Sequence, residues 1–172
     1  MENKEKELIK ILRSAEESEK EALLNYLKFA RQTQDIGGKN MFIRLAIDEF
    51  GHMTLLGNQI NNLMAQKGWQ AVEVDRSAVE PLLPKISQKD IQTMGKANTN
   101  ELSALETARA LEQRAIDYYS TNARNTAFPE IQATFKRLAE MEEAHYTMIQ
   151  AEIDNIKKTG FWFDTIEYSV EG

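Results

Sequence analysis

The sequence predicts an all-α protein: a bundle of four long helices arranged as two helical hairpins. Three observations predict it. Apolar residues recur at helical spacing along four long stretches, the 172 residues include only three prolines, and one pattern of residues occurs twice, 93 positions apart. The abundance of Glu, Lys, Leu, Ala and Gln favours helix over strand. A chain of this length is expected to form a single domain over residues 1–172.

The first hairpin is predicted from residues 4–33 and 39–67. Both stretches repeat apolar side chains every three or four positions, which is typical of a helix with one face in a core. Between them, residues 35–38 read Asp-Ile-Gly-Gly and predict a turn. Gly68 follows the second stretch and suits a C-terminal cap.

The second hairpin is predicted from the residues that mark helix ends. The third helix should begin near Asn98, because Asn98-x-x-Glu101 resembles a capping box, and should continue to about residue 125. The fourth should start at Pro129, a residue suited to a first helical turn, and reach Lys158.

Residues 69–97 predict a long crossover between the two hairpins. They include two prolines, alternating valines at 72 and 74, and a short helical pattern at 87–94. Adjacent antiparallel helices need only a few connecting residues, so a connection this long lets the second and third helices run parallel, as in ferritin-like bundles. The C-terminal tail, residues 160–172, carries an aromatic run at 161–163 that is predicted either to contribute to a dimer or to cover the protein's own core.

The repeated pattern consists of a Glu, a Tyr seven residues later and a Glu-x-x-His thirty residues after the first Glu. The two copies align without a gap over residues 19–60 and 112–153, with 14 identities in 42 positions. The chain has only two histidines, and they occupy equivalent places. The repeated residues are Glu19, Tyr26, Glu49 and His52, then Glu112, Tyr119, Glu142 and His145.

The four repeated glutamates are predicted to lie at one level in the bundle. In each hairpin the two glutamates are equidistant from the turn, and each helical residue rises about 1.5 Å, so all four should lie roughly 21 Å from the turns. Each Glu-x-x-His places both side chains on one helical face. Four glutamates and two histidines are therefore expected to converge at mid-bundle.

This set of side chains predicts a site for two metal ions. One Glu from each of two helices and a Glu-x-x-His from each of the others is the constellation of di-iron and di-manganese carboxylate bundles. Two divalent cations would cancel the four negative charges, which would otherwise repel one another in the core. The chain has no cysteine, which excludes thiolate ligands. Mixed ligation by oxygen and nitrogen suits two ions of iron or manganese, and zinc could also occupy the site in vitro.

Tyr26 and Tyr119 lie two turns beyond the first glutamate of each copy, on the same face. Each is predicted to assist the reaction by hydrogen-bonding a ligating carboxylate of an opposite helix. Taken singly, a Glu-x-x-His would be interpreted as a surface pair and either tyrosine as a core residue. The repeat favours the metal site, although a purely structural bundle with a vestigial or zinc-filled site is a further interpretation.

At these residues the sequence resembles the rubrerythrin-like branch of the ferritin-like superfamily. The resemblance covers roughly residues 4–158, and its segments are 19–26, 48–52, 112–119, 128–131 and 142–145. It implies a four-helix bundle around a non-haem di-iron centre, a homodimer, and redox chemistry with hydrogen peroxide or dioxygen. The sequence departs from the family in two ways: it lacks the Cys-x-x-Cys of a rubredoxin-like domain, and Ala115 and Arg109 stand where a seventh carboxylate is common.

The function expected from these observations is a di-iron oxidoreductase active in oxidative stress. It would reduce hydrogen peroxide or dioxygen with electrons from an external donor such as a rubredoxin-like protein. The alternative is an iron-binding ferroxidase that serves iron storage or detoxification. The net charge of −6 and pI near 5.1 argue against nucleic acid and against an anionic membrane as partners. The charged N-terminus and the absence of a long apolar run predict a cytoplasmic protein.

Overall fold

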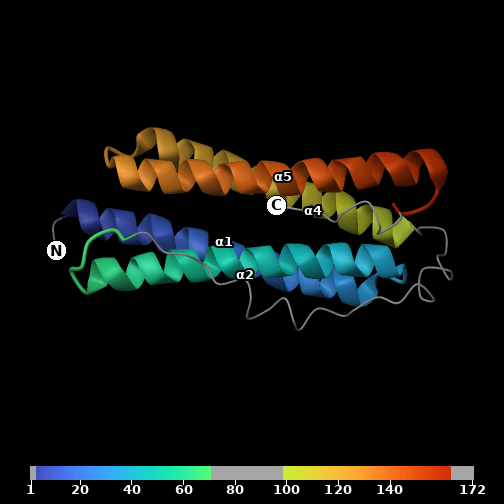
Figure 1. The fold of residues 1–172 in the computed structure, drawn as a ribbon, viewed down its shortest axis with the longest axis horizontal. Helices are drawn as coiled ribbons and strands as arrows, with labels where there is room; N and C mark the ends of the chain where they lie inside the picture. The colour runs from blue at the N-terminus through green and yellow to red at the C-terminus, as the bar shows by residue number, and fades with distance from the viewer. Residues whose placement is uncertain (1–2, 71–98, 164–172) are drawn as a thin grey trace.

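The structure is a computed structural model that describes residues 3–70 and 99–163. These two ranges contain four helices: α1 (Asn3–Gln32), α2 (Ile36–Met64), α4 (Thr99–Asn125) and α5 (Pro129–Thr159). Helices α1 and α2 form one antiparallel hairpin and α4 and α5 a second, and the hairpins lie side by side (Figure 1). No strand occurs within the described ranges. The predicted all-α, ferritin-like bundle is confirmed.

Helices α2 and α4 run in the same direction, as predicted from the length of the connection between them. In Figure 1, α2 ends at the opposite end of the bundle from the point where α4 begins. The crossover itself was predicted at residues 69–97, and the alternating valines and the short helical pattern within it lie outside the described residues, as does the tail beyond residue 163.

The turn between α1 and α2 is shorter than predicted. Asp35 is the N-cap of α2, and its carboxylate accepts a hydrogen bond from the backbone N–H of Gly38 at 3.0 Å. The helix therefore begins at Ile36 and includes both glycines, because the cap satisfies an N–H of its first turn. The predicted turn at residues 35–38 and the predicted start at residue 39 are wrong.

The end of α2 also differs from the prediction. The helix stops at Met64, with Ala65 as the C-cap, and Gln66 has a positive φ of 58°. The backbone N–H groups of Gln66 and Lys67 bond to carbonyls of Leu63 and Asn62, which closes the helix before Gly68 is reached. The predicted end at residue 67, capped by Gly68, is therefore wrong, although Gly68 also has a positive φ of 72°.

Glu101 makes a contact that the sequence did not predict. Its Oε1 accepts hydrogen bonds from the backbone N–H groups of Gln34, at 2.7 Å, and Asp35, at 3.4 Å. A residue of α4 thus satisfies donors in the turn of the first hairpin. Asn98, the other half of the predicted capping box, lies outside the described residues.

The apolar core is divided into two clusters. One gathers around Phe42, Tyr26 and Trp162, and the other around Phe135, Tyr119 and Leu12. Because Phe42 and Phe135 are repeat equivalents, as are the two tyrosines, each end of the bundle is packed by corresponding residues. The buried charged residues of the repeat belong to neither cluster.

The internal repeat extends beyond the residues aligned from the sequence. Trp69 and Trp162 are equivalent, and each packs on one of the two clusters. The buried side chains of Gln59 and Glu152 are equivalent too: Gln59 hydrogen-bonds the backbone of Gln70, and Glu152 accepts from the N–H of Phe163 at 2.8 Å. For Trp162, which is 4% exposed, the interpretation that the tail covers the protein's own core is therefore the one that the structure supports.

Candidate metal centre

The structure brings the six repeated glutamates and histidines together at mid-bundle, and all six are buried, with exposed fractions between 1% and 7%. Helices α1 and α4 contribute one glutamate each, and α2 and α5 contribute a Glu-x-x-His each. The prediction that these side chains converge depended on their equal distance from the hairpin turns. Their role as metal ligands stays a prediction.

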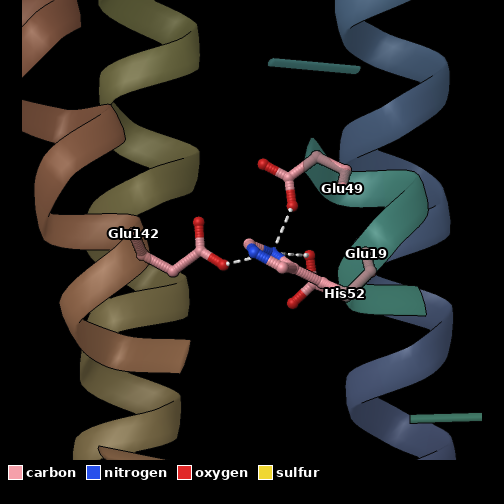
Figure 2. Close-up of side chains that lie close together, drawn as sticks. All are labelled: Glu19, Glu49, His52 and Glu142. Carbon is pink, nitrogen blue, oxygen red and sulfur yellow. Dashed lines mark hydrogen bonds and ion pairs between the residues drawn. The ribbon is translucent and has the colours of Figure 1, made fainter. Parts of the chain in front are cut away.

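The first group of side chains surrounds the ring of His52. Its Nδ1 lies 2.9 Å from Glu142 Oε1, 3.1 Å from Glu49 Oε2 and 3.6 Å from Glu19 Oε2. Figure 2 shows the ring between Glu142, which comes from the second hairpin, and the two glutamates of the first. One nitrogen and three carboxylate oxygens thus face one another, with all four potential ligand atoms within 4.8 Å of each other.

The second group surrounds His145 in the same way. Its Nδ1 lies 3.2 Å from Glu142 Oε2, 3.3 Å from Glu49 Oε1 and 3.7 Å from Glu112 Oε2. The two imidazole rings are stacked with their centroids 5.8 Å apart. The two copies of the sequence repeat therefore form two groups of side chains with corresponding contacts.

Glu49 and Glu142 belong to both groups, whereas Glu19 and Glu112 belong to one each. Each shared carboxylate directs one oxygen to His52 and the other to His145. A carboxylate placed in this way can bridge two cations. If cations bind here, this geometry would make Glu49 and Glu142 the bridging carboxylates and Glu19 and Glu112 the capping ones.

Hydrogen bonds alone cannot satisfy this arrangement. An imidazole Nδ1 carries at most one proton, but three carboxylate oxygens approach each Nδ1. Glu49 Oε1 and Glu142 Oε1 are buried, and each faces one of these crowded nitrogens, Nδ1 of His145 at 3.3 Å and Nδ1 of His52 at 2.9 Å. A divalent cation in each group would accept all of these lone pairs at once, so the donor set fits a pair of metal ions.

The pKa values of the carboxylates separate into two classes. Burial raises the pKa of Glu112 to about 8 and raises that of Glu19 well above its ordinary value. Burial acts on Glu49 and Glu142 as well, but hydrogen bonds outweigh it and hold their pKa values below the usual range. These bonds are with Glu19 and then both histidines for Glu49, and with both histidines for Glu142. In the metal-free protein these pKa shifts favour the ionised form of Glu49 and Glu142 and the protonated form of Glu19 and Glu112.

The histidines complete this charge balance. Burial would lower the pKa of both His52 and His145, but hydrogen bonds with the surrounding carboxylates raise it well above the ordinary value. Two imidazolium ions then offset the two ionised glutamates. Without metal, protons on the histidines and on two of the glutamates thus neutralise the cluster. With all four carboxylates ionised, two divalent cations would neutralise it instead.

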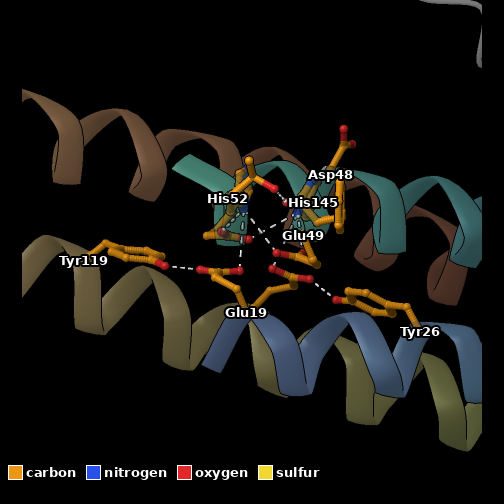
Figure 3. A network of polar contacts seen from close by, with 11 residues as sticks. Glu19, Tyr26, Asp48, Glu49, His52, Tyr119 and His145 are labelled. Atoms are coloured by element: carbon orange, nitrogen blue, oxygen red, sulfur yellow. Dashed lines mark hydrogen bonds and ion pairs between the residues drawn. The ribbon is translucent and has the colours of Figure 1, made fainter. Parts of the chain in front are cut away.

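Tyr26 and Tyr119 reach across the bundle to the capping carboxylates. The hydroxyl of Tyr26 on α1 donates to Glu112 on α4, and that of Tyr119 on α4 donates to Glu19 on α1. Figure 3 shows the two tyrosines approaching the cluster from opposite ends. The predicted hydrogen bond to a carboxylate of an opposite helix is present in both copies, and the role of the tyrosines in a reaction stays a prediction.

Asp48 is a residue of the site to which the sequence analysis gave no role. It precedes Glu49 on α2, and its Oδ2 lies 3.4 Å from Nε2 of His145 on α5 (Figure 3). The repeat could not reveal it, because the equivalent position holds Met141. The signal available in the sequence was an acidic side chain directly beside a predicted ligand.

A narrow cavity of about 100 Å³ leads to the cluster between α1 and α4. Glu19 and Glu112 line it, and so do Ala22 and Ala115, which lie one turn further along their helices. Glu49 and Glu142 also border it. The cavity therefore connects the carboxylates to the face formed by these two helices.

Comparison with known protein families shows which family this chain belongs to. The family model described as Rubrerythrin matches residues 10–153, which is most of the chain. The chain belongs to the rubrerythrin family. This is a ferritin-like, di-iron family, as the resemblance implied. Neither the search of curated proteins nor that of solved structures gave a significant match.

Membership of the rubrerythrin family implies a di-iron centre, and the buried glutamates and histidines form groups able to hold metal. Ala115, one of the two residues near Glu112 at which no further carboxylate stands, lines the cavity. Among the helices that the structure describes, none is both long enough and apolar enough to cross a membrane.

Proposed function

We propose that this rubrerythrin-family protein is a di-iron oxidoreductase that reduces hydrogen peroxide or dioxygen. The observation that carries the proposal is the pair of four-residue groups that share Glu49 and Glu142. Each group would hold one cation, and Glu49 and Glu142 would be ligands of both. Iron at this centre would supply, for each peroxide reduced to two waters, two electrons and a Lewis acid.

Different residues of the chain would bind the metal ions and position the ligands. Glu49 and Glu142 would bind both ions, and His52 and His145 would each present Nδ1 to one ion. The capping carboxylates are held in place by the tyrosine hydroxyls of the opposite hairpin. Two apolar clusters pack the bundle on either side of these polar groups.

The cavity between α1 and α4 suits a small oxidant. Its volume of about 100 Å³ admits a molecule of the size of peroxide or dioxygen and excludes an organic substrate of ordinary size. Reduction of peroxide to water also consumes two protons. The hydroxyls of Tyr26 and Tyr119 hold the protons that lie against the capping carboxylates.

The proposed cycle requires a reductant that the chain does not contain. With no cysteine, these 172 residues offer no rubredoxin-type iron site, so we propose an external one-electron donor such as a rubredoxin-like protein. We also propose a homodimer. The ferroxidase role shares the oxidation step but requires a large shell, so the mass of the assembly separates the two functions.

The experiment that tests this function follows Fe(II) in an anaerobic stopped-flow instrument. Protein loaded with two Fe(II) per chain is mixed with one equivalent of hydrogen peroxide, and in a second series with dioxygen. We expect both Fe(II) ions to be oxidised by one peroxide, much faster than free Fe(II) under the same conditions. A second portion of peroxide, added after reduction by an external donor, should be consumed at the same rate.

His52→Ala and His145→Ala should abolish the fast oxidation, because each removes the nitrogen ligand of one group. Glu143→Gln is the matched control: it removes an exposed charge next to Glu142 and should leave the rate unchanged. Oxidation no faster than that of free Fe(II) would contradict the proposal. An assembly of many subunits in light scattering, with iron retained as a mineral, would favour the ferroxidase role instead.

A further inference from the structure

The two histidines of the cluster differ at the nitrogen that faces away from the carboxylates. Nε2 of His145 lies 3.4 Å from the carboxylate of Asp48 (Figure 3). Nε2 of His52 is buried and has no hydrogen-bond partner among the described residues. Around Nδ1 the two rings have matching sets of three oxygens, so the difference lies entirely on the outer side.

The sequence shows the origin of this difference. Asp48 lies on α2, immediately before the bridging Glu49, and reaches across to the histidine of α5. The equivalent residue on α5, immediately before the bridging Glu142, is Met141. A thioether is at best a weak acceptor for an imidazole N–H, whereas a carboxylate is a strong one. The repeat thus preserves the six proposed ligands but not the acceptor outside them.

An acceptor at the outer nitrogen changes what the inner nitrogen can do. A carboxylate beside Nε2 holds the ring proton there, which leaves the lone pair of Nδ1 free to bind a cation and makes it more basic. Asp48 does this for His145 and also fixes the direction of the ring. Within residues 3–70 and 99–163, His52 has no such partner, so neither the position of its ring proton nor the direction of its ring is fixed in this way.

We propose that the two metal positions are inequivalent, and that Asp48 is the positioning residue that makes them so. The position formed by His145, Glu112 and the two bridging glutamates binds the first cation, and the position formed by His52 and Glu19 binds the second more weakly. The chain therefore fills its centre in a set order, and its one-metal state has the ion on the His145 side. This inference rests on the proposed metal centre and adds its internal asymmetry.

Titration of the metal-free protein with Co(II) tests this directly, with calorimetry to give affinities and the visible spectrum of bound Co(II) to report each environment. We expect two binding steps with affinities that differ by roughly 10- to 100-fold, the usual effect of such an outer partner. His52→Ala should remove the weaker step, and His145→Ala should remove the tighter one. These two variants assign the steps to positions.

Variants at the outer residues then test the cause. Asp48→Asn, which keeps the shape of the side chain, should weaken the tighter step by roughly 10- to 100-fold and leave the weaker step and its spectrum unchanged. Met141→Asp, which supplies the missing carboxylate, should strengthen the weaker step. Glu143→Gln, which alters an exposed acidic residue of the same helix, should change neither step.

The outcomes separate this inference from the proposed function. Two steps of equal affinity, or an Asp48→Asn variant that weakens both steps alike or neither, would overturn the asymmetry while leaving the metal centre intact. No cobalt binding by the folded wild-type protein would overturn both. Circular dichroism of each variant confirms that a lost step reflects the site and not the fold.

Discussion

The bridging and capping glutamates differ in what holds them, although the sequence presents four equal carboxylates. Glu49 and Glu142 are held by both histidines, whereas Glu19 and Glu112 each receive a tyrosine hydroxyl from the other hairpin. A buried carboxylate oxygen that loses its donor costs the free energy of its desolvation. The tyrosines therefore stabilise the cluster before any metal is bound.

Replacement of Tyr119 by Phe tests this contribution at the scale of one hydrogen bond. We expect Tyr119→Phe to lower the free energy of unfolding of the metal-free protein by about 1–3 kcal/mol, because the oxygen of Glu19 stays buried without its donor. Urea denaturation in the presence of a chelator measures this.

Tyr118→Phe is the comparison: its hydroxyl donates to the backbone carbonyl of Ile11 in a half-buried position, so the loss should be smaller, about 0.5–1.5 kcal/mol. Equal losses in the two variants would show that the carboxylate is not the reason.

At the scale of one element, α2 is positioned by a close approach at its N-terminal end. A Cβ at Gly38 would lie 2.7 Å from ring atoms of Trp162 and 2.8 Å from Cγ2 of Thr33. Trp162 and Thr33 are both buried, so neither can move away without cost. The glycine thus lets the residues after α5 pack against the start of α2, on the same helix that carries Glu49 and His52.

Alanine substitutions at Gly38 and Gly57 of α2 should have opposite effects on stability. Each substitution gains about 1 kcal/mol of helix propensity. Gly38→Ala also overpacks a rigid contact, which costs typically about 1–3 kcal/mol, so we expect a net loss of stability and a change in tryptophan fluorescence. At Gly57 a Cβ meets only the end of the flexible Glu16 side chain, at 2.7 Å, so Gly57→Ala should be neutral or stabilising. Thermal unfolding of both variants measures the difference, and a Gly38→Ala protein as stable as Gly57→Ala would refute the packing argument.

Over the whole molecule, protons and metal ions compete for one buried cluster. Glu19, Glu112 and both histidines have folded-state pKa values above their ordinary ones. Such groups contribute stability that is complete below the unfolded pKa and is lost as pH rises through the folded pKa. The pKa values of Glu49 and Glu142 are lowered, so the stability they contribute is already complete above about pH 4.5 and does not vary near neutrality.

The metal-free protein should therefore become less stable as pH rises from about 6.5 to 9. Glu112, with its pKa raised to about 8, loses its proton within this window. Urea denaturation with a chelator at several pH values measures the slope, and Glu112→Gln should reduce it. With metal bound the sign should reverse, because ligands that must release protons bind a cation better at higher pH. A metal-free stability that stays constant or rises across this window would contradict the charge balance inferred for the cluster.

Much of the fold and of the candidate site could be predicted from the sequence, because local rules govern both. Helical periodicity identified four helices, and the equal spacing of the glutamates from the hairpin turns placed them at one level. The errors occurred at the ends of α2, where Asp35 caps the first turn and the left-handed Gln66 follows the C-cap Ala65, through contacts that spacing does not reveal. The equivalence of Trp69 and Trp162 appears in the same alignment only when it is extended past residue 60.

The sequence by itself determined which side chains form the cluster, since the repeated Glu, Tyr and Glu-x-x-His occupy equivalent places in two hairpins of equal geometry. Only the tertiary structure decided how these side chains divide their roles. Whether a carboxylate bridges or caps depends on distances between helices of different hairpins, and Glu49 and Glu142 are the two that reach both histidines. The pairing of Asp48 with His145 likewise arises across the hairpins, at a position where the repeat does not hold, so the asymmetry of the centre is a property of packing.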